Sequence, residues 1–180
     1  MNEMTTESVN SERDCRNLSI DPGACEKGRE MEKQYEQTVR VTFCNTNAEG
    51  NMSHDEYARL FGIVRELMGL DLIPGFKEDA GSRYLLKTKS ASYEYRRDFR
   101  FGDTVRVRMG VAEVTGASFT LQAAFINAAC GVVHAVGRQQ IVFADMEGRP
   151  KRFPQELREL LTMMLNENEN GNEKEGRRTE

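Results

Sequence analysis

One long amphipathic segment followed by four alternating segments is the feature that most constrains the fold. In residues 53–69, apolar side chains recur at spacings of three and four, which predicts a helix with one apolar face. In residues 84–100, 104–111, 118–125 and 133–143, apolar and polar residues alternate, which predicts half-buried strands. Because each element has one face to bury, the sequence predicts an α+β domain in which a curled antiparallel sheet wraps around one long helix.

Two further elements complete the predicted order. Residues 35–43 alternate in the same way and predict a strand before the long helix, so that the sheet has about five strands. A short C-terminal helix is expected to begin near Pro154, since proline is allowed in a first turn. Its apolar stripe consists of Leu157, Leu160, Leu161 and Met164. The connections between the later strands are short, as in hairpins.

The ends of the long helix carry recognisable signals. Ser53 is a natural N-cap, and Glu56 lies three residues further on, so the pair predicts a capping box. Gly69 is expected to help end the helix.

Composition explains where the domain lies in the chain. Only 38% of the residues are hydrophobic and 30% are charged, which is low in apolar content for a globular domain. The polar residues are concentrated in residues 1–31 and 166–180. We therefore expect a disordered polar leader at 1–31, one domain at 32–165 and a disordered tail at 166–180, because such segments cannot offset their ordering entropy.

Several functional classes are disfavoured. The chain has 25 basic and 29 acidic residues, so a general nucleic-acid surface is not expected. No apolar run is long enough to cross a membrane, and the first residues lack the pattern of a signal peptide. The four cysteines form no CxxC pair and the two histidines lie far apart, so we expect free thiols in a reducing, cytoplasmic compartment, with no metal and no cofactor.

The segment between the first strand and the long helix carries a motif. Residues 46–57 read TNAEGNMSHDEY, in which Thr46, Gly50, His54 and Tyr57 match the pattern T-D-x-x-G-x-x-x-H-x-x-Y. This pattern resembles that of the hotdog-fold acyl thioesterases of the 4-hydroxybenzoyl-CoA thioesterase family, and the likeness covers about residues 34–161. The resemblance implies the hotdog fold, thioester hydrolysis, and a homodimer or homotetramer with pockets between subunits.

One position departs from that pattern. The family's catalytic aspartate is Asn47 here, and an asparagine can neither accept a proton from water at neutral pH nor form a useful acyl anhydride. The nearest likeness is the enediyne polyketide thioesterase branch, which carries T-N-x-x-G-N and an arginine inside the helix, matched here by Asn51 and Arg65. That branch tends to have aromatic residues after Gly-Asn, where this chain has Met52.

This resemblance implies hydrolysis of an acyl or polyketide thioester held on an acyl carrier protein or on CoA. Asn47 would position the water or the thioester carbonyl as a catalytic residue, and Arg65 would supply positive charge. Backbone N–H groups at a helix start suit the charge that develops on the carbonyl oxygen. Substrate contacts are expected at the motif residues around that helix start, namely Gly50, Asn51, His54 and Tyr57.

Plainer interpretations of the same residues remain open. Asn47 and Gly50 are common in turns, and Tyr57 lies on the apolar face of the predicted helix, where it serves the core first. Arg65 lies at the edge of the apolar stripe, where an arginine usually reaches out to solvent. It is also about 16 Å along the helix from His54, so a shared site would need a deep pocket or a dimer.

Two alternatives to hydrolysis follow. A hotdog protein that binds an acyl thioester without hydrolysing it would also lack the carboxylate. A hotdog dehydratase is disfavoured, because its pairing of histidine with an acidic residue in another motif is not found. Five basic residues are candidates to attract a CoA phosphate or an acidic carrier protein, namely Arg96, Arg97, Arg100, Lys151 and Arg152.

Overall fold

The computed structural model describes residues 34–165. Its five strands, its long helix and its C-terminal helix follow the predicted order. A 3₁₀ turn before the long helix and a short helix after it were not predicted. The elements are β1 (Tyr35–Arg40), η1 (Phe43–Asn45), α1 (His54–Leu72), α2 (Phe76–Asp79), β2 (Leu85–Tyr95), β3 (Thr104–Val114), β4 (Ser118–Asn127), β5 (Val133–Ala144) and α3 (Gln155–Met163).

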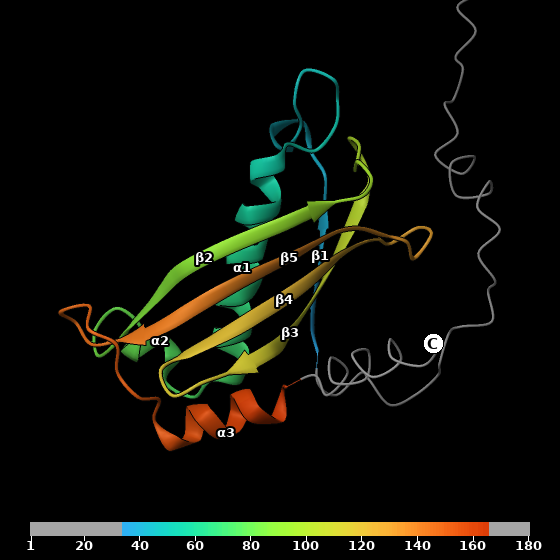
Figure 1. Cartoon of the computed structure of the whole chain (residues 1–180). Coiled ribbons are helices and arrows are strands. Elements are labelled where there is room, and N and C mark those ends of the chain that lie inside the picture. The colour runs from blue at the N-terminus through green and yellow to red at the C-terminus, as the bar shows by residue number, and fades with distance from the viewer. Residues whose placement is uncertain (1–33, 166–180) are drawn as a thin grey trace, which may run out of the picture.

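The five strands form one antiparallel sheet in the order β1-β3-β4-β5-β2. Helix α1 lies across one face of the sheet and α3 lies near one end of it (Figure 1). The predicted hotdog architecture, a sheet around one long helix, is therefore confirmed. Strands β1 and β2 are the two edges, and β2 is the longer, with most of its residues exposed.

The core lies between α1 and the sheet. The strand alternation was predicted in the correct phase, since Val105, Val107 and Met109 are fully buried on β3. Phe61 and Val64 on α1 are fully buried as well, because they lie on its apolar stripe. Helix α3 adds Leu157 and Leu161 from the predicted C-terminal stripe.

Three local expectations were wrong. The first strand ends at Arg40, and Phe43 belongs to the 3₁₀ turn with 76% of its surface exposed. Strand β2 ends at Tyr95 rather than near residue 100. Gly69 does not end α1, which continues to Leu72. A Cβ at Gly69 would lie 2.6 Å from Phe76 Cζ, so the glycine is required by close packing instead.

The predicted leader and tail lie outside the described residues. In the part of the chain that the structure describes, no helix is long and apolar enough to cross a membrane. Cys44 and Cys130, the two cysteines within that part, are both free.

Candidate active site

Residues 42–53, which we call the site loop, join β1 to α1 and are closed by Asn45. The Asn45 side-chain oxygen accepts hydrogen bonds from the Thr42 backbone N–H (2.8 Å) and the Thr42 hydroxyl (2.6 Å). Its amide nitrogen donates to Glu56 Oε2 at 2.9 Å, and its backbone carbonyl accepts from Ser53 N at 2.9 Å. Asn45 is buried, so these bonds satisfy both ends of its amide and hold the two ends of the site loop together.

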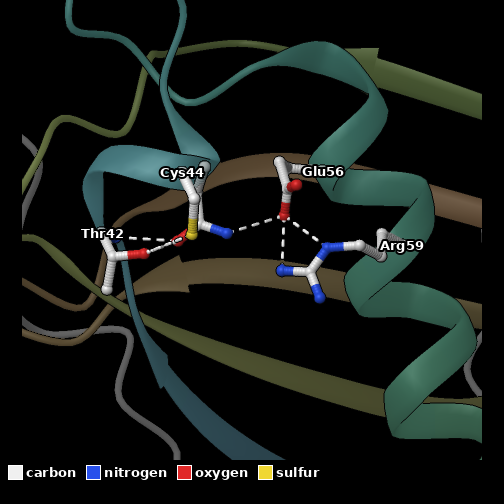
Figure 2. Close-up of polar contacts among 5 residues, drawn as sticks. Thr42, Cys44, Glu56 and Arg59 are labelled. Carbon is white, nitrogen blue, oxygen red and sulfur yellow. Dashed lines mark hydrogen bonds and ion pairs between the residues drawn. The ribbon is translucent and has the colours of Figure 1, made fainter.

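Glu56 is the second buried polar residue at the base of the loop. Its Oε2 also accepts from Arg59 Nε (2.7 Å) and Nη2 (2.6 Å), as Figure 2 shows. Ser53 is the N-cap as predicted, but it makes no side-chain capping bond, so the expected capping box is wrong. The carboxylate turns to Asn45 and Arg59 because a buried charge needs paired, hydrogen-bonded neighbours.

Asn47 lies on the exposed side of the same loop. Its Oδ1 accepts from the backbone N–H groups of Glu49 (2.9 Å) and Asn51 (3.1 Å). Two N–H donors require an oxygen at that position, so the NH₂ group of the amide points the other way. No residue in the described chain accepts a hydrogen bond from this NH₂ group. The side chain of Asn47 therefore presents a hydrogen-bond donor on the surface of the loop.

Gly50 and Asn51 form the turn of the loop. Gly50 has a φ of +78°, a left-handed conformation that favours glycine, and no atom lies within 4 Å of where its Cβ would be. The Gly50 carbonyl accepts from Phe101 N at 3.3 Å, and Asn51 pairs with Arg100. The backbone N–H groups of residues 49–53 are all used inside the protein. At the start of α1, Glu56 N donates to Ser53 O at 3.1 Å, whereas the N–H groups of His54 and Asp55 find no acceptor among the described residues.

His54 begins α1 and is exposed beside the loop. Its backbone carbonyl accepts a hydrogen bond from the Tyr95 hydroxyl at 3.3 Å. This contact fastens the end of β2 to the start of α1, so the end of edge strand β2 lies next to the site loop.

Tyr57 is a core residue, with 2% of its surface exposed. Its ring meets those of Tyr95 and Phe125 edge-on, at centroid distances of 5.0 and 5.2 Å. Burial raises the pKa of Tyr57 to about 12, helped by the negative charge of Asp98 and opposed by a hydrogen bond with the Phe99 backbone. The phenol is therefore neutral, and its contact with substrate remains a prediction.

Arg65 lies on a different part of α1. Its Nη1 donates to Thr88 Oγ1 (2.9 Å) and to Gln139 Oε1 (3.1 Å), and Gln139 Nε2 donates to the Tyr93 hydroxyl (2.8 Å). The guanidinium is thus held against β2 and β5 instead of reaching freely into solvent. Within one chain, the structure gathers five of the six predicted site residues around the start of α1 and places Arg65 apart from them.

Sequence reasoning missed two groups of polar residues. The pair of Asn45 and Glu56 joins residues 11 apart through a non-helical turn, for which no spacing rule exists. Gln139 did leave a signal, because it occupies the buried phase of β5 between Gly137 and Ile141. A polar residue at a predicted core position requires a partner.

The other face of the sheet carries a groove of about 320 Å³. It is lined by Ser90, Ser92, Glu113, Thr120, Arg138 and Gln140. None of the predicted site residues contributes to it. The basic residue Arg96 is paired with Glu94 at 2.9 Å, so its charge is partly neutralised locally.

The chain belongs to the Thioesterase-like superfamily, whose family model matches residues 39–161. This match spans the whole site loop, α1 and strands β2 to β5. A comparison with curated protein sequences gives no match.

Solved structures agree with this family. The chain is similar to the dynemicin thioesterase, described in connection with polyene binding, at 26% identity and a TM-score of 0.69, covering 74% of this chain and 98% of that one. The fold is shared with a gentisyl-coenzyme A thioesterase at 22% identity (TM-score 0.62, covering 71% and 98%). It is also shared with a Staphylococcus aureus protein solved in complex with CoA, at 17% identity (TM-score 0.64, covering 73% and 80%).

Proposed function

We propose that this protein hydrolyses an acyl or polyketide thioester carried by an acyl carrier protein or by CoA, with Asn47 and the helix-start donors in place of a catalytic carboxylate. The observation that carries the proposal is the orientation of the Asn47 amide. Its oxygen is held by two backbone N–H groups, and none of the described residues accepts a hydrogen bond from its NH₂ group.

An NH₂ group at this position suits the thioester carbonyl. Attack of water on the carbonyl carbon places negative charge on the oxygen, and a fixed donor stabilises that charge more than it stabilises the ground state. The backbone N–H groups of His54 and Asp55 and the positive end of the α1 dipole act in the same direction. The tetrahedral intermediate then expels the thiolate, which takes up a proton, and the carboxylic acid is released.

We propose further that the site is completed across a dimer formed by β2. This 11-residue edge strand has no neighbour on its outer side within the described chain, and such an edge favours pairing. Twofold antiparallel pairing would set the Tyr95 end of β2, which touches His54, beside the Thr88 end of the partner's strand. Because Arg65 is bonded to Thr88, the partner subunit's Arg65 would then approach the site loop.

The carrier of the acyl group is left between two candidates. Exposed arginines near the loop, such as Arg100, would attract either the phosphates of CoA or the acidic surface of a carrier protein. A cytoplasmic location remains a proposal from cysteine usage.

The test is release of free thiol from purified protein mixed with acyl-CoA and with acyl-carrier-protein thioesters. We expect saturable turnover on one of the two. Saturable binding without thiol release would instead support the non-catalytic thioester-binding protein, which the missing carboxylate also permits.

Two Asn47 variants separate the roles of its amide. Asn47→Ala removes both the loop bonds and the donor, whereas Asn47→Asp keeps an oxygen for the two backbone N–H groups but replaces the donor with the carboxylate of the family pattern. We expect Asn47→Ala to lower kcat at neutral pH by about a hundredfold, the cost of removing one oxyanion donor, while activity in Asn47→Asp would report a carboxylate acting as base or nucleophile. Thermal melting checks that each variant is folded, and near-normal kcat in folded Asn47→Ala would refute the donor role.

A further inference from the structure

A single buried carboxamide links three elements away from the site loop. Gln139 on β5 is 6% exposed and bonds Arg65 of α1 through its oxygen and Tyr93 of β2 through its nitrogen. Gly137 makes room for this arrangement, because a Cβ there would lie 2.7 Å from Tyr93 Cε1. The Tyr93 ring also meets Phe61 at right angles, so the ring position is fixed by packing on both sides.

The chemistry of the three side chains fixes which atom donates and which accepts in the hydrogen bonds that join Arg65, Gln139 and Tyr93. An arginine guanidinium can only donate, so the Gln139 oxygen must face Arg65. The Gln139 NH₂ group must then face Tyr93, whose oxygen accepts. The hydroxyl hydrogen of Tyr93 is consequently directed elsewhere, and no acceptor for it is found among residues 34–165.

Arg65 is left with unused donors in the same way. Both of its hydrogen bonds come from Nη1, and the described residues offer no acceptor to its Nε or Nη2. Two unused donor groups, one phenolic and one cationic, therefore lie on the two sides of one carboxamide. Tyr93 is half-buried on β2, and its ring lies on the face of the sheet that α1 covers.

We propose that, in the site completed across the dimer, Tyr93 donates its hydroxyl hydrogen to the thioester carbonyl oxygen of the substrate next to Arg65, and that Gln139 is the positioning residue that holds both groups. This inference rests on the proposed function, because the substrate and the role of Arg65 come from it. Burial raises the pKa of the Tyr93 phenol, which keeps the hydrogen in place at neutral and mildly alkaline pH.

The test compares hydroxyl deletion at two tyrosines. Tyr93→Phe removes only the proposed donor, and we expect kcat on the preferred thioester to fall about tenfold to a hundredfold with KM nearly unchanged, because a bond to developing charge is gained in the transition state. The matched control is Tyr84→Phe, in which the lost hydroxyl belongs to a core ring stacked near Phe143. Its kcat should equal that of the wild type.

The positioning role of Gln139 is tested by non-additivity. Gln139→Leu should lower kcat at least as much as Tyr93→Phe does, because it releases Arg65 as well as the Tyr93 hydroxyl. Adding Tyr93→Phe to Gln139→Leu should then cost little more. A purely structural glutamine would give additive losses together with a lowered melting temperature.

The outcomes separate this inference from the proposed function. Absence of turnover in the wild type overturns the proposed function and, with it, this inference. Turnover in the wild type with unchanged kcat in Tyr93→Phe overturns the role of Tyr93 while leaving the proposed function standing.

Discussion

Asn45 and Asn47 lie two residues apart and use their amide groups differently. The amide of Asn45 is buried and satisfied at both ends by Thr42 and Glu56. The amide of Asn47 is exposed, and among residues 34–165 only its oxygen has hydrogen-bond partners. One asparagine therefore shapes the site loop, while the other presents a free donor from it.

The Glu56 carboxylate should be important for stability. Glu56→Ala leaves the buried Asn45 NH₂ group without its acceptor, so we expect the free energy of unfolding to fall by about 1–3 kcal/mol. Glu66→Ala is the control, because it removes an exposed carboxylate from the same helix. Urea unfolding measures both, and equal effects would contradict the role of the buried network.

His134 should make stability depend on pH. Burial lowers the pKa of this imidazole below its ordinary value, and the positive charge of Arg97 acts in the same direction. A hydrogen bond to the Asp98 backbone and the negative charges of Asp103 and Asp98 raise the pKa but do not outweigh burial. The unfolded chain therefore binds the proton more readily than the folded one. The contribution of the neutral imidazole to the free energy of unfolding is complete above about pH 6.5 and is lost as the pH falls toward the pKa in the folded state.

The comparison is His134→Gln, which removes the titration. Below about pH 6.5 the free energy of unfolding of the wild type should fall more steeply than that of the variant, by at most about 1.4 kcal/mol per pH unit. Urea unfolding from pH 7.5 to 5 measures the difference. Parallel curves would show that His134 is not responsible.

At the level of elements, α1 connects the site loop to the sheet, and its two glycines differ in surroundings. Gly69 faces the Phe76 ring of α2, with no space for a methyl group, whereas no atom lies within 4 Å of a Cβ at Gly62. The same residue type therefore has a packing role at one position and none at the other.

This contrast predicts opposite effects of the same substitution. Gly62→Ala should raise the free energy of unfolding by about 0.5–1 kcal/mol, because alanine restricts the unfolded chain and favours helix. Gly69→Ala should lower it by about 1 kcal/mol, since displacement of Phe76 outweighs that gain. Thermal or urea unfolding of the two variants decides, and a stabilised Gly69→Ala would show that Phe76 moves without cost.

At the level of the whole molecule, Asn47 and Arg65 belong to separate regions of one chain. The site loop surrounds the start of α1, and Arg65 lies about 16 Å further along the same helix. There Arg65 donates hydrogen bonds to Thr88 of β2 and Gln139 of β5. The twofold pairing of β2 proposed above would bring the two regions together between subunits.

Subunit mixing tests that arrangement. Asn47→Ala and Arg65→Ala should each be nearly inactive, but a mixed dimer contains one site with both residues intact. Random mixing of the two inactive variants should restore about a quarter of the wild-type activity, since half the dimers are mixed and half their sites are complete. The measurement is thiol release after co-refolding, and no recovery would indicate that both residues act within one chain.

Much of the fold was predictable because it depends on repetition. The alternation in β3 to β5 and the helical spacing in α1 predicted these elements, their buried faces and a sheet wrapped around one helix, which the structure confirms. The roles of single residues were harder to predict. Gly69 was expected to end the helix but is required by packing against Phe76. Glu56 was expected to form a capping box but bonds Asn45 instead.

The sequence alone determined which groups are present: an amide at residue 47 where the family pattern has a carboxylate, a glycine turn after it and an arginine inside the helix. Only the tertiary structure decided how those groups point. The Asn47 amide is oriented by the backbone of its own loop, and Arg65 and Tyr93 are aimed by a glutamine from β5. Hydrogen-bond directions depend on partners distant in the chain, and periodic patterns contain no information about them.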